Sequence, residues 1–456
     1  MILILGAGLS GASCSYHLGH DNCVVLEKRL RPGGHIAVDR RDGFVWDPGP
    51  HVSFTKNVYV RELFASSVDG DLHELDVTTV NYFEGHWVEH PAQTALYQVP
   101  EPLRGECLAS LLAARHSSRQ VPPTSNYRQW LESSSGEVFT RTFAGPYTRK
   151  YWTRDPADMT TDWVGTRVLD AQIDDVIKGA RGPLGRKTHY ITRARYPRKC
   201  GFQSFARTLF AGARIEFGAE AVSVDLKRRT VRTADGRRFT YSTLVNTLPL
   251  PIFVGMCAHV PAMIQEAALS LSCSQLLLVN VIAPHPTRRP EHWIYVYDSD
   301  KLSTRINCTE RLAAANAPAG WTGVQVEVYF SRHRPLEVSP TEVGPRVLAE
   351  LIHMGLVDPS ECEDPGNIDH HIRYSPWANV IFDHDTRPAL DQIWTWLEQY
   401  GLEREPDDLS PLTDWERRVP SGSSLSRLVM AGRFGQWKYY WTDDCVLRGK
   451  MVGELA

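Results

Sequence analysis

The sequence contains no pair of cysteines at C-x-x-C spacing, although nine cysteines are scattered along its 456 residues. This scatter argues against a zinc site or a disulfide framework and favours a reduced, cytoplasmic setting. The chain also lacks an uninterrupted apolar run of about 18 residues, so we expect no membrane span and no membrane partner. The apolar stretch of residues 1–5 is too short for the core of a secretory signal.

A large excess of charge of either sign is also missing. The formal net charge is -3, so no overall positive field attracts nucleic acid, and we expect the basic stretch 191–200 to be a solvated face. The composition, 42% hydrophobic and 23% charged, is ordinary for a globular enzyme. A chain of 456 residues without internal repeats is too long for one small core, so two intertwined domains are expected.

What the N-terminus does contain is a phosphate-binding pattern. Residues 2–5 (ILIL) predict a buried parallel strand, and glycines follow at G-x-G-x-x-G spacing before a helical pattern. Gly6 allows the tight turn, Gly8 lets a pyrophosphate approach the backbone, and Gly11 lets the helix pack closely on the strand. The free N–H groups and the positive dipole end of such a helix attract the phosphates.

The segment that follows indicates which kind of dinucleotide cofactor the chain binds. A second predicted strand, 23–27, ends in Glu27, whose carboxylate would accept hydrogen bonds from ribose hydroxyls and disfavour the 2′-phosphate of NADP. The chain then continues through a basic loop, the pair Gly33-Gly34 and a predicted β-hairpin instead of another βα unit. This arrangement resembles the large FAD family that contains amine oxidases, protoporphyrinogen oxidases and sugar mutases.

Two later segments extend this resemblance. Residues 201–250 predict a helix, a strand ending near Val222, a hairpin turning at Asp235-Gly236 and a strand to Thr247. Residues 428–454 predict a strand, a glycine turn and a helix that starts near Asp444. The resemblance implies that this helix points its N-terminus at the flavin. The resemblance places Val222 on the adenine side. The implied cofactor-binding residues are Gly6, Gly8, Ser10, Gly11, Glu27, Lys28, Gly33, Gly34, His35, Pro50, His51, Val222, Gly432, Arg433 and Asp444.

The expected fold class is α/β, with a discontinuous Rossmann-type FAD-binding domain and a mixed helical and antiparallel-sheet substrate domain. The FAD-binding domain is predicted to comprise residues 1–60, 195–250 and 415–456. The substrate-binding domain is predicted to comprise residues 61–194 and 251–414, with a helical part at about 101–180 and a sheet part at about 270–335.

Within that FAD family, four scattered stretches resemble UDP-galactopyranose mutases, particularly the eukaryotic-type form. The first, DPGPHVSF at 47–54, matches a glycine-histidine loop that contacts the flavin, with His51 as the histidine and Pro50 where glycine is usual. The second, at 85–100, keeps the family's glutamine as Gln93, on the nucleotide side, and has His90 where tyrosine is common.

The third stretch, 143–168, contains the family's P-Y, W and W-x-G-x-R-V elements without a gap. The resemblance implies that Arg167 binds the diphosphate, because a guanidinium is a bidentate donor to phosphate. It also implies that Tyr147 and Trp152 shape the nucleobase pocket with their ring faces. Thr148 replaces an asparagine that reads the base in the family, so the identity of the base stays open.

The fourth stretch joins 293–305 with 432–444. Trp293, Tyr295 and Arg305 reproduce a family spacing in which the arginine is the second diphosphate ligand. Arg433 would lie by the FAD, and Tyr439 would bond a substrate phosphate. Asp443 replaces an asparagine, and a carboxylate beside a diphosphate is unfavourable by about 1 kcal/mol at 4 Å in water. Asp443 therefore turns away, or Lys438 compensates, or the substrate differs.

The resemblance implies a mutase that interconverts the pyranose and furanose forms of a nucleotide sugar through a covalent adduct of the sugar with N5 of reduced FAD. NAD(P)H is a possible reductant, and a homo-oligomer is possible. The implied catalytic residues are His51, Arg167 and Arg305, and the implied substrate-binding residues are His90, Gln93, Tyr147, Thr148, Trp152, Arg167, Tyr295, Arg305, Tyr439 and Asp443.

Two alternatives stay open. One is an FAD-dependent oxidoreductase of the amine oxidase type with an apolar cleft, and the other is a flavin-binding protein without catalysis. The pair Arg167 and Arg305 favours an anionic substrate over an apolar one. The sequence shows no Ser-His-Asp triad and no paired catalytic carboxylates, and we expect no metal site.

Overall fold

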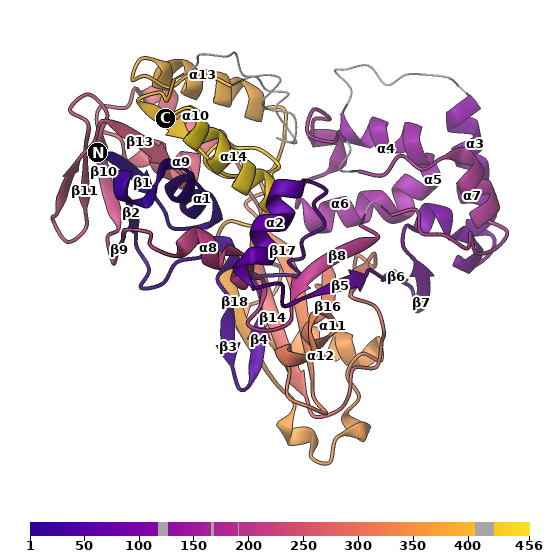
Figure 1. Ribbon diagram of the computed structural model, residues 1–456. Coiled ribbons are helices and arrows are strands. Elements are labelled where there is room, and N and C mark those ends of the chain that lie inside the picture. Colours follow the sequence, from indigo (N-terminus) through magenta and orange to yellow (C-terminus); the bar gives the residue numbers. More distant parts are fainter. Residues whose placement is uncertain (117–125, 166–167, 190, 406–423) are drawn as a thin grey trace.

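The computed structural model describes residues 1–116, 126–165, 168–189, 191–405 and 424–456. Figure 1 shows three lobes around a common centre: a lobe with both termini and a parallel sheet, a lobe of helices, and a lobe built on a larger sheet. The expected fold class, α/β with a Rossmann-type sheet and a mixed helical and sheet region, is confirmed by this arrangement.

The first sheet has five parallel strands in the order β19-β13-β1-β2-β9. They are β1 (Ile2–Leu5), β2 (Cys23–Glu27), β9 (Ile215–Phe217), β13 (Thr243–Asn246) and β19 (Leu428–Met430). The strands come from three distant parts of the chain. Every residue of β2 is buried, as expected for a parallel sheet covered on both faces.

Two helices from opposite ends of the chain pack together beside this sheet (Figure 1). They are α1 (Leu9–Leu18) and α14 (Thr442–Glu454). Their close approach requires glycine, because a Cβ added at Gly449 would lie 2.2 Å from Ser13 Oγ and one at Gly453 would lie 2.5 Å from His17 Cβ. The C-terminal helix therefore closes the fold around the N-terminal strand and turn.

One strand boundary differs from the prediction. The parallel strand β9 ends at Phe217 rather than near Val222, because Gly218 (φ +68°) turns the chain in the left-handed region. Val222 instead lies in β10 (Ala221–Asp225), which forms an antiparallel sheet with β11 (Thr230–Thr233) and β12 (Arg238–Thr240).

The larger sheet has seven strands in the order β18-β14-β17-β16-β15-β6-β7. They are β6 (Thr79–Phe83), β7 (His86–Glu89), β14 (Gln275–Ala283), β15 (Trp293–Val296), β16 (Arg305–Cys308), β17 (Thr322–Phe330) and β18 (Asp369–Ser375). All neighbours are antiparallel except the parallel pair β15 and β6. The sheet thus extends beyond the predicted residues 270–335 at both edges.

The helical lobe is formed by α3 (Leu103–His116), α4 (Tyr127–Ser135), α5 (Glu137–Phe139), α6 (Gly145–Tyr151) and α7 (Ile173–Gly179). A π-helical turn, Thr140–Ala144, joins α5 to α6. The other helices are α2 (Val58–Ser67), α8 (Arg207–Phe210), α9 (Leu250–Met256), α10 (Ala262–Ser270), α11 (Thr309–Leu312), α12 (Pro340–His353) and α13 (Thr386–Glu398). The hairpin of β3 (Asp39–Arg41) and β4 (Phe44–Trp46) and the antiparallel pair of β5 (Leu72–Asp76) with the distant β8 (Arg193–Pro197) complete the fold. Of the helices in the described ranges, none combines the length and the apolarity that crossing a bilayer requires.

Candidate functional site

A cavity of about 390 Å³ lies between α6, the strands β14 to β17 and three loops, and is called the aromatic cavity below. The loops are 48–54, which follows β4, 375–379 and 433–442. Twelve of the sequence-predicted site residues line it: His35, Pro50, His51, His90, Gln93, Tyr147, Thr148, Trp152, Tyr295, Arg305, Arg433 and Tyr439. Segments far apart in the sequence thus contribute to one cavity.

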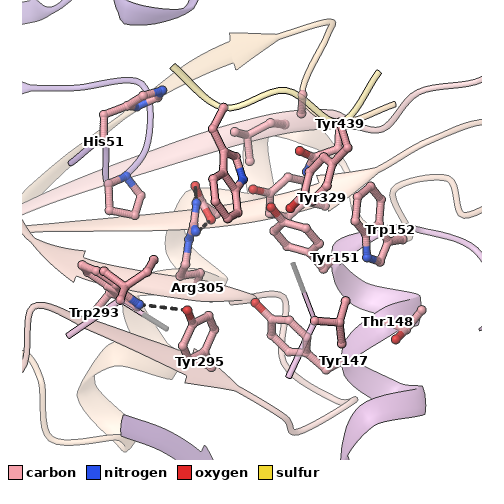
Figure 2. A pocket seen from close by; sticks show the side chains of 18 of the residues that line it. His51, Tyr147, Thr148, Tyr151, Trp152, Trp293, Tyr295, Arg305, Tyr329 and Tyr439 are labelled. Carbon is pink, nitrogen blue, oxygen red and sulfur yellow. Dashed lines mark hydrogen bonds and ion pairs between the residues drawn. The ribbon is translucent and has the colours of Figure 1, made fainter. Parts of the chain in front are cut away.

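Tyrosine and tryptophan side chains form two walls of the aromatic cavity (Figure 2). Helix α6 presents Tyr147 and Tyr151 four residues apart, so their rings stack with centroids 5.9 Å apart. Tyr295 on β15 lies 5.7 Å from the Tyr147 ring, and Tyr329 on β17 lies 4.9 Å from the Tyr151 ring. Such faces suit a planar ring or the apolar face of a sugar.

A buried ion pair lies at the centre of the aromatic cavity (Figure 2). Arg305 Nε donates to Glu327 Oε2 and Arg305 Nη2 donates to Glu327 Oε1, both at 2.7 Å, in a bidentate pair across β16 and β17. The Glu327 side chain is 2% exposed and that of Arg305 is 23% exposed. Burial disfavours the Arg305 charge, but Glu327 and nearby tyrosines outweigh it and raise the arginine pKa.

The ion pair leaves much of the Arg305 guanidinium available. A guanidinium has five N–H donors, and Glu327 accepts from two of them. No other acceptor among the described residues bonds the remaining three. Arg305 can therefore still bind an anion, while Glu327 holds it in place.

The His51 loop lies against this ion pair. Gly49 has φ +98°, and a Cβ there would lie 2.7 Å from Glu327 Oε1, so only glycine fits. His51 Nδ1 donates to Gly49 O at 3.1 Å, which leaves Nε2 as an acceptor. Burial lowers the His51 pKa to about 4, so the ring is neutral at physiological pH.

Asp47 anchors the start of this loop. Its carboxylate accepts from Tyr196 Oη at 2.6 Å and from the backbone N–H of Phe202 at 2.9 Å. Burial raises the Asp47 pKa to about 7 although both hydrogen bonds oppose the shift. The side chain faces away from the cavity and acts on it only through the loop it holds.

His90 presents a hydrogen-bond acceptor at the Tyr295 end of the aromatic cavity, where the two ring centroids lie 4.4 Å apart. Asn81 Nδ2 donates to Val88 O and Glu89 O at 3.1 Å each, so Asn81 Oδ1 is the acceptor for His90 Nδ1 at 2.8 Å. This network assigns the proton to Nδ1 and the lone pair to Nε2. Gln93 lines the same end, and no described residue bonds its amide. The two groups are available to a ligand with N–H or O–H donors.

Thr148 does not substitute for a base-reading amide. Its hydroxyl donates to Ala144 O at 2.7 Å, one turn back on its own helix. Trp152, 5% exposed, packs against Trp163 at 4.7 Å and Tyr439 at 5.1 Å, so it supports the wall more than it exposes a face.

The cofactor glycines Gly6, Gly8, Gly11, Gly33 and Gly34 come together as one structure, called the glycine cradle below. Gly33 N donates to Ala7 O at 2.8 Å, and a Cβ at Gly34 would lie 3.0 Å from Gly8 Cα. A Cβ at Gly11 would lie 2.0 Å from Gly6 O. Gly8 precedes α1 without a side-chain cap, so the first N–H groups of this helix are open to an anion. These residues fit the pyrophosphate of a dinucleotide.

Other predicted cofactor residues surround the cradle. Glu27 is 8% exposed and accepts from the backbone N–H of Ala7 at 2.8 Å and of Arg29 at 2.9 Å, which fixes its carboxylate beside the turn. Ser10 is buried, and a Cβ at Gly432 would lie 2.5 Å from its Oγ. Lys28 is exposed after β2. Val222 is 38% exposed on β10, outside the parallel sheet.

The C-terminal loop links the cradle to the aromatic cavity. Arg433 donates to Tyr440 O at 2.7 Å and to Asn379 Oδ1 at 3.2 Å, and its guanidinium lies 5.6 Å from the Tyr439 ring centre. Asp444 is 1% exposed and caps α14 by accepting from Trp441 N at 2.8 Å. Asp443 lies in the first turn of α14 and is not among the described residues that line the cavity. Arg167 lies outside the described residues.

Several lining residues were not predicted. Glu327 is the most important, and its signal in the sequence is a lone charge in the otherwise apolar strand pattern TGVQVEVYF. Further examples are Tyr151, His189, Tyr297, Tyr329, Trp377 and Asn379. A chain with 17 tyrosines and 13 tryptophans gives no local signal to separate these from core aromatics.

Comparison with known proteins agrees with these features. Residues 7–292 match the family described as flavin containing amine oxidoreductase. The fold resembles a reduced UDP-galactopyranose mutase with a TM-score of 0.86 at 19% identity, over 99% of this chain and 94% of that one. A CLA-producing fatty acid isomerase from P. acnes gives 0.62 at 14% identity, over 99% and 97%. A putrescine oxidase bound to putrescine gives 0.61 at 15% identity, over 99% and 98%. The family match covers more than half of the residues, and the chain belongs to the flavin containing amine oxidoreductase family.

Proposed function

We propose that this protein is a flavin-dependent mutase that interconverts the pyranose and furanose forms of a nucleotide-linked sugar. The observation that carries the proposal is Arg305, a buried cation with three uncommitted N–H groups in an aromatic-walled cavity beside the His51 loop. A diphosphate matches those donors, and the aromatic walls match a nucleobase and a sugar. The likeness to UDP-galactopyranose mutase supports the same ligand class.

Different residues of the aromatic cavity suit different parts of such a substrate. Tyr295 Oη accepts from Trp293 Nε1 at 2.9 Å, so its own proton can be donated to a phosphate beside Arg305. We place the base against His90 Nε2 and the Gln93 amide, because nucleobases carry N–H donors and planar faces. In this proposal the Asp443 carboxylate is turned away from the diphosphate, because Asp443 is not among the described residues that line the cavity.

The cofactor in this proposal is FAD, held at its pyrophosphate by the glycine cradle and the open N-terminus of α1. When bound and reduced, FAD would supply the nucleophile for the anomeric carbon of the sugar. The chain's own residues would retain the expelled nucleoside diphosphate: Arg305 by charge, and Tyr147 and Tyr295 by hydrogen bonds. Retention makes the return of the leaving group effectively unimolecular. NAD(P)H as reductant and a cytoplasmic location belong to the same proposal.

The test is a turnover assay with flavin in each redox state. The purified protein is reduced with dithionite under argon and given UDP-galactopyranose, then GDP- and dTDP-linked sugars, and the products are separated by chromatography. Interconversion that requires reduced flavin and consumes no stoichiometric reductant supports the proposal and identifies the nucleotide. Absence of any isomerisation with a fully flavin-loaded, reduced protein contradicts it.

A second candidate is an oxidase of amines. The family description and the putrescine oxidase likeness favour it, and Glu327 supplies a buried carboxylate that could face an ammonium group. Arg305 already neutralises that carboxylate, so this function requires the ion pair to open. Bleaching of the oxidised flavin by amines, with no isomerisation of nucleotide sugars, would establish it.

A further inference from the structure

Lys150 is a buried lysine next to the aromatic cavity but outside its lining. It lies on α6 between Arg149 and Tyr151 and is 2% exposed. Its Nζ donates to three backbone carbonyl oxygens: Val296 O at 3.0 Å, Asp298 O at 2.8 Å and Ser303 O at 2.6 Å. All three belong to the end of β15 and the connection to β16, so one side chain ties α6 to that hairpin.

The same connection is held from its other side. Glu350 on α12 accepts from Leu302 N at 2.7 Å, from Ser303 N at 3.0 Å and from Ser303 Oγ at 2.6 Å. Ser303 therefore bonds Lys150 through its carbonyl oxygen and Glu350 through its N–H and hydroxyl. The Lys150 ammonium donates to carbonyl oxygens of the connection, and the Glu350 carboxylate accepts from its N–H and hydroxyl groups. Both faces of the connection are therefore held by hydrogen bonds.

The two elements that Lys150 joins carry facing parts of the aromatic cavity. Helix α6 carries Tyr147 and Tyr151, while the hairpin carries Tyr295 and Arg305, and Arg305 follows Ser303 by two residues. We propose that Lys150 is a positioning residue whose ammonium group sets the spacing between these two walls, so that the α6 tyrosines and Arg305 contact the same ligand. The nature of that ligand, a nucleoside diphosphate, rests on the proposed function.

The charged form of Lys150 is the one that fits this role. An ammonium has three hydrogens for three carbonyls, whereas a neutral amine has two and leaves one carbonyl without a donor. Burial and Arg334 lower the Lys150 pKa to about 7, while Glu350, Asp298 and Asp300 oppose the shift. The amine thus loses a hydrogen bond as pH rises through about 7, and the spacing should loosen with it.

The experiment compares Lys150→Met, which removes the donors, with Lys150→Arg, which keeps the charge at every accessible pH. Lys178→Met, at an exposed lysine on α7, is the matched control. UDP is titrated into each flavin-loaded protein by calorimetry at pH values below and above 7. Deuterium uptake of peptides covering residues 145–151 and 293–308 is measured without ligand.

We expect Lys150→Met to take up deuterium faster in both peptides and to bind UDP about tenfold more weakly, with the control unchanged. We expect UDP affinity to fall with rising pH in the wild type and to fall less in Lys150→Arg if that variant folds. Unchanged uptake, or faster uptake with UDP affinity equal to the wild type, would overturn the proposal. If the wild type does not bind UDP, GDP and dTDP are titrated in its place. Binding of none of the three contradicts the proposed function; deuterium uptake then decides, with faster exchange in both peptides supporting the positioning role and unchanged exchange refuting it.

Discussion

The glycine cradle and the aromatic cavity meet at the same loops but are built in opposite ways. The cradle offers backbone: glycines that permit close approach and the uncapped N–H groups of α1. The aromatic cavity offers side chains, and its polar groups are fixed by partners from distant segments, as Arg305 is by Glu327 and His90 by Asn81. The backbone N–H groups of the cradle suit an anion such as a phosphate, and no side chain of the glycines can change that preference. The aromatic cavity can change its ligand by single substitutions, in line with the likeness of this fold to both a mutase and an oxidase.

The largest effect is expected in the cradle, where substitution at Gly11 should break the fold itself. A Cβ there would lie 2.0 Å from Gly6 O, so Gly11→Ala must push α1 away from the β1 turn. We expect a loss of about 3 kcal/mol or more in the free energy of unfolding. Urea unfolding measures it; a variant of wild-type stability would show that helix and turn are not in contact.

Gly8→Val should abolish cofactor binding without unfolding the protein. A Cβ at Gly8 meets only Gly34 Cα, at 3.8 Å, so the fold has room for a side chain that would occupy the place of the pyrophosphate. We expect a folded protein without flavin, measured by its visible absorbance and far-ultraviolet circular dichroism. A normal flavin content would refute the assignment of the cradle.

Arg305→Ala should leave the cradle intact and disable the cavity. We expect full flavin content and a turnover lowered by about 100-fold or more, because the leaving diphosphate loses its cation. The variant also leaves Glu327 buried without a partner, at a cost of about 3 kcal/mol.

The double variant Arg305→Met/Glu327→Leu is the control for that cost. It should regain stability and remain inactive, since it restores packing but supplies no cation. Turnover within twofold of wild type in either variant would exclude Arg305 from the reaction.

Acid should destabilise the folded protein through buried histidines that line the aromatic cavity. Burial lowers the pKa of His35, His51 and His189 to about 4 from 6.5, so between these values the unfolded chain binds protons that the folded one excludes. The free energy of unfolding therefore falls as pH falls through this window. Burial also raises the pKa of Asp47, to about 7, and the pKa values of Glu132 and Glu310, and these carboxyls work in the opposite direction. They are fewer than the histidines whose pKa burial lowers, which include His17, His90 and His292 as well.

We expect the free energy of unfolding to fall by a few kcal/mol between pH 6.5 and 4, which urea unfolding at each pH measures. Asp47→Asn removes an opposing group and should make this fall steeper. A stability that is constant across the window would mean that these histidines are charged or solvated in the folded protein.

The smallest effect is expected from Tyr147→Phe. The Tyr147 hydroxyl is buried and has no hydrogen-bond partner among the described residues, so it is available only to a ligand. Its removal should leave stability unchanged or slightly raised and weaken UDP binding by about threefold to tenfold. A loss of stability with no change in affinity would indicate a purely structural hydroxyl.

Much of the cradle could be predicted from the sequence, because its parts are local. A strand, three spaced glycines and a helix follow one another within residues 2–18, so their geometry follows from the order of residues alone. The predicted end of strand β9 was wrong because Gly218 ends the strand early. The φ angle of a single glycine among alternating residues cannot be predicted from the sequence.

The aromatic cavity could be predicted only in part. The family resemblance pointed to Arg305, Tyr295 and His90, and all three line the cavity. Glu327 and Asn81, which fix them, were missed because each lies in another segment and pairs across strands or loops. Whether a tyrosine faces a cavity or a core depends on packing between elements, which sequence spacing does not encode.

The most direct test of the central claim, that the aromatic cavity holds a diphosphate at Arg305, is to compare the binding of UDP and uridine to the flavin-loaded protein by calorimetry. We predict that UDP binds at least about tenfold more tightly than uridine and that this difference disappears in Arg305→Met/Glu327→Leu. Equal affinities for UDP and uridine in the wild type, or a preference for UDP that survives in the double variant, would contradict it.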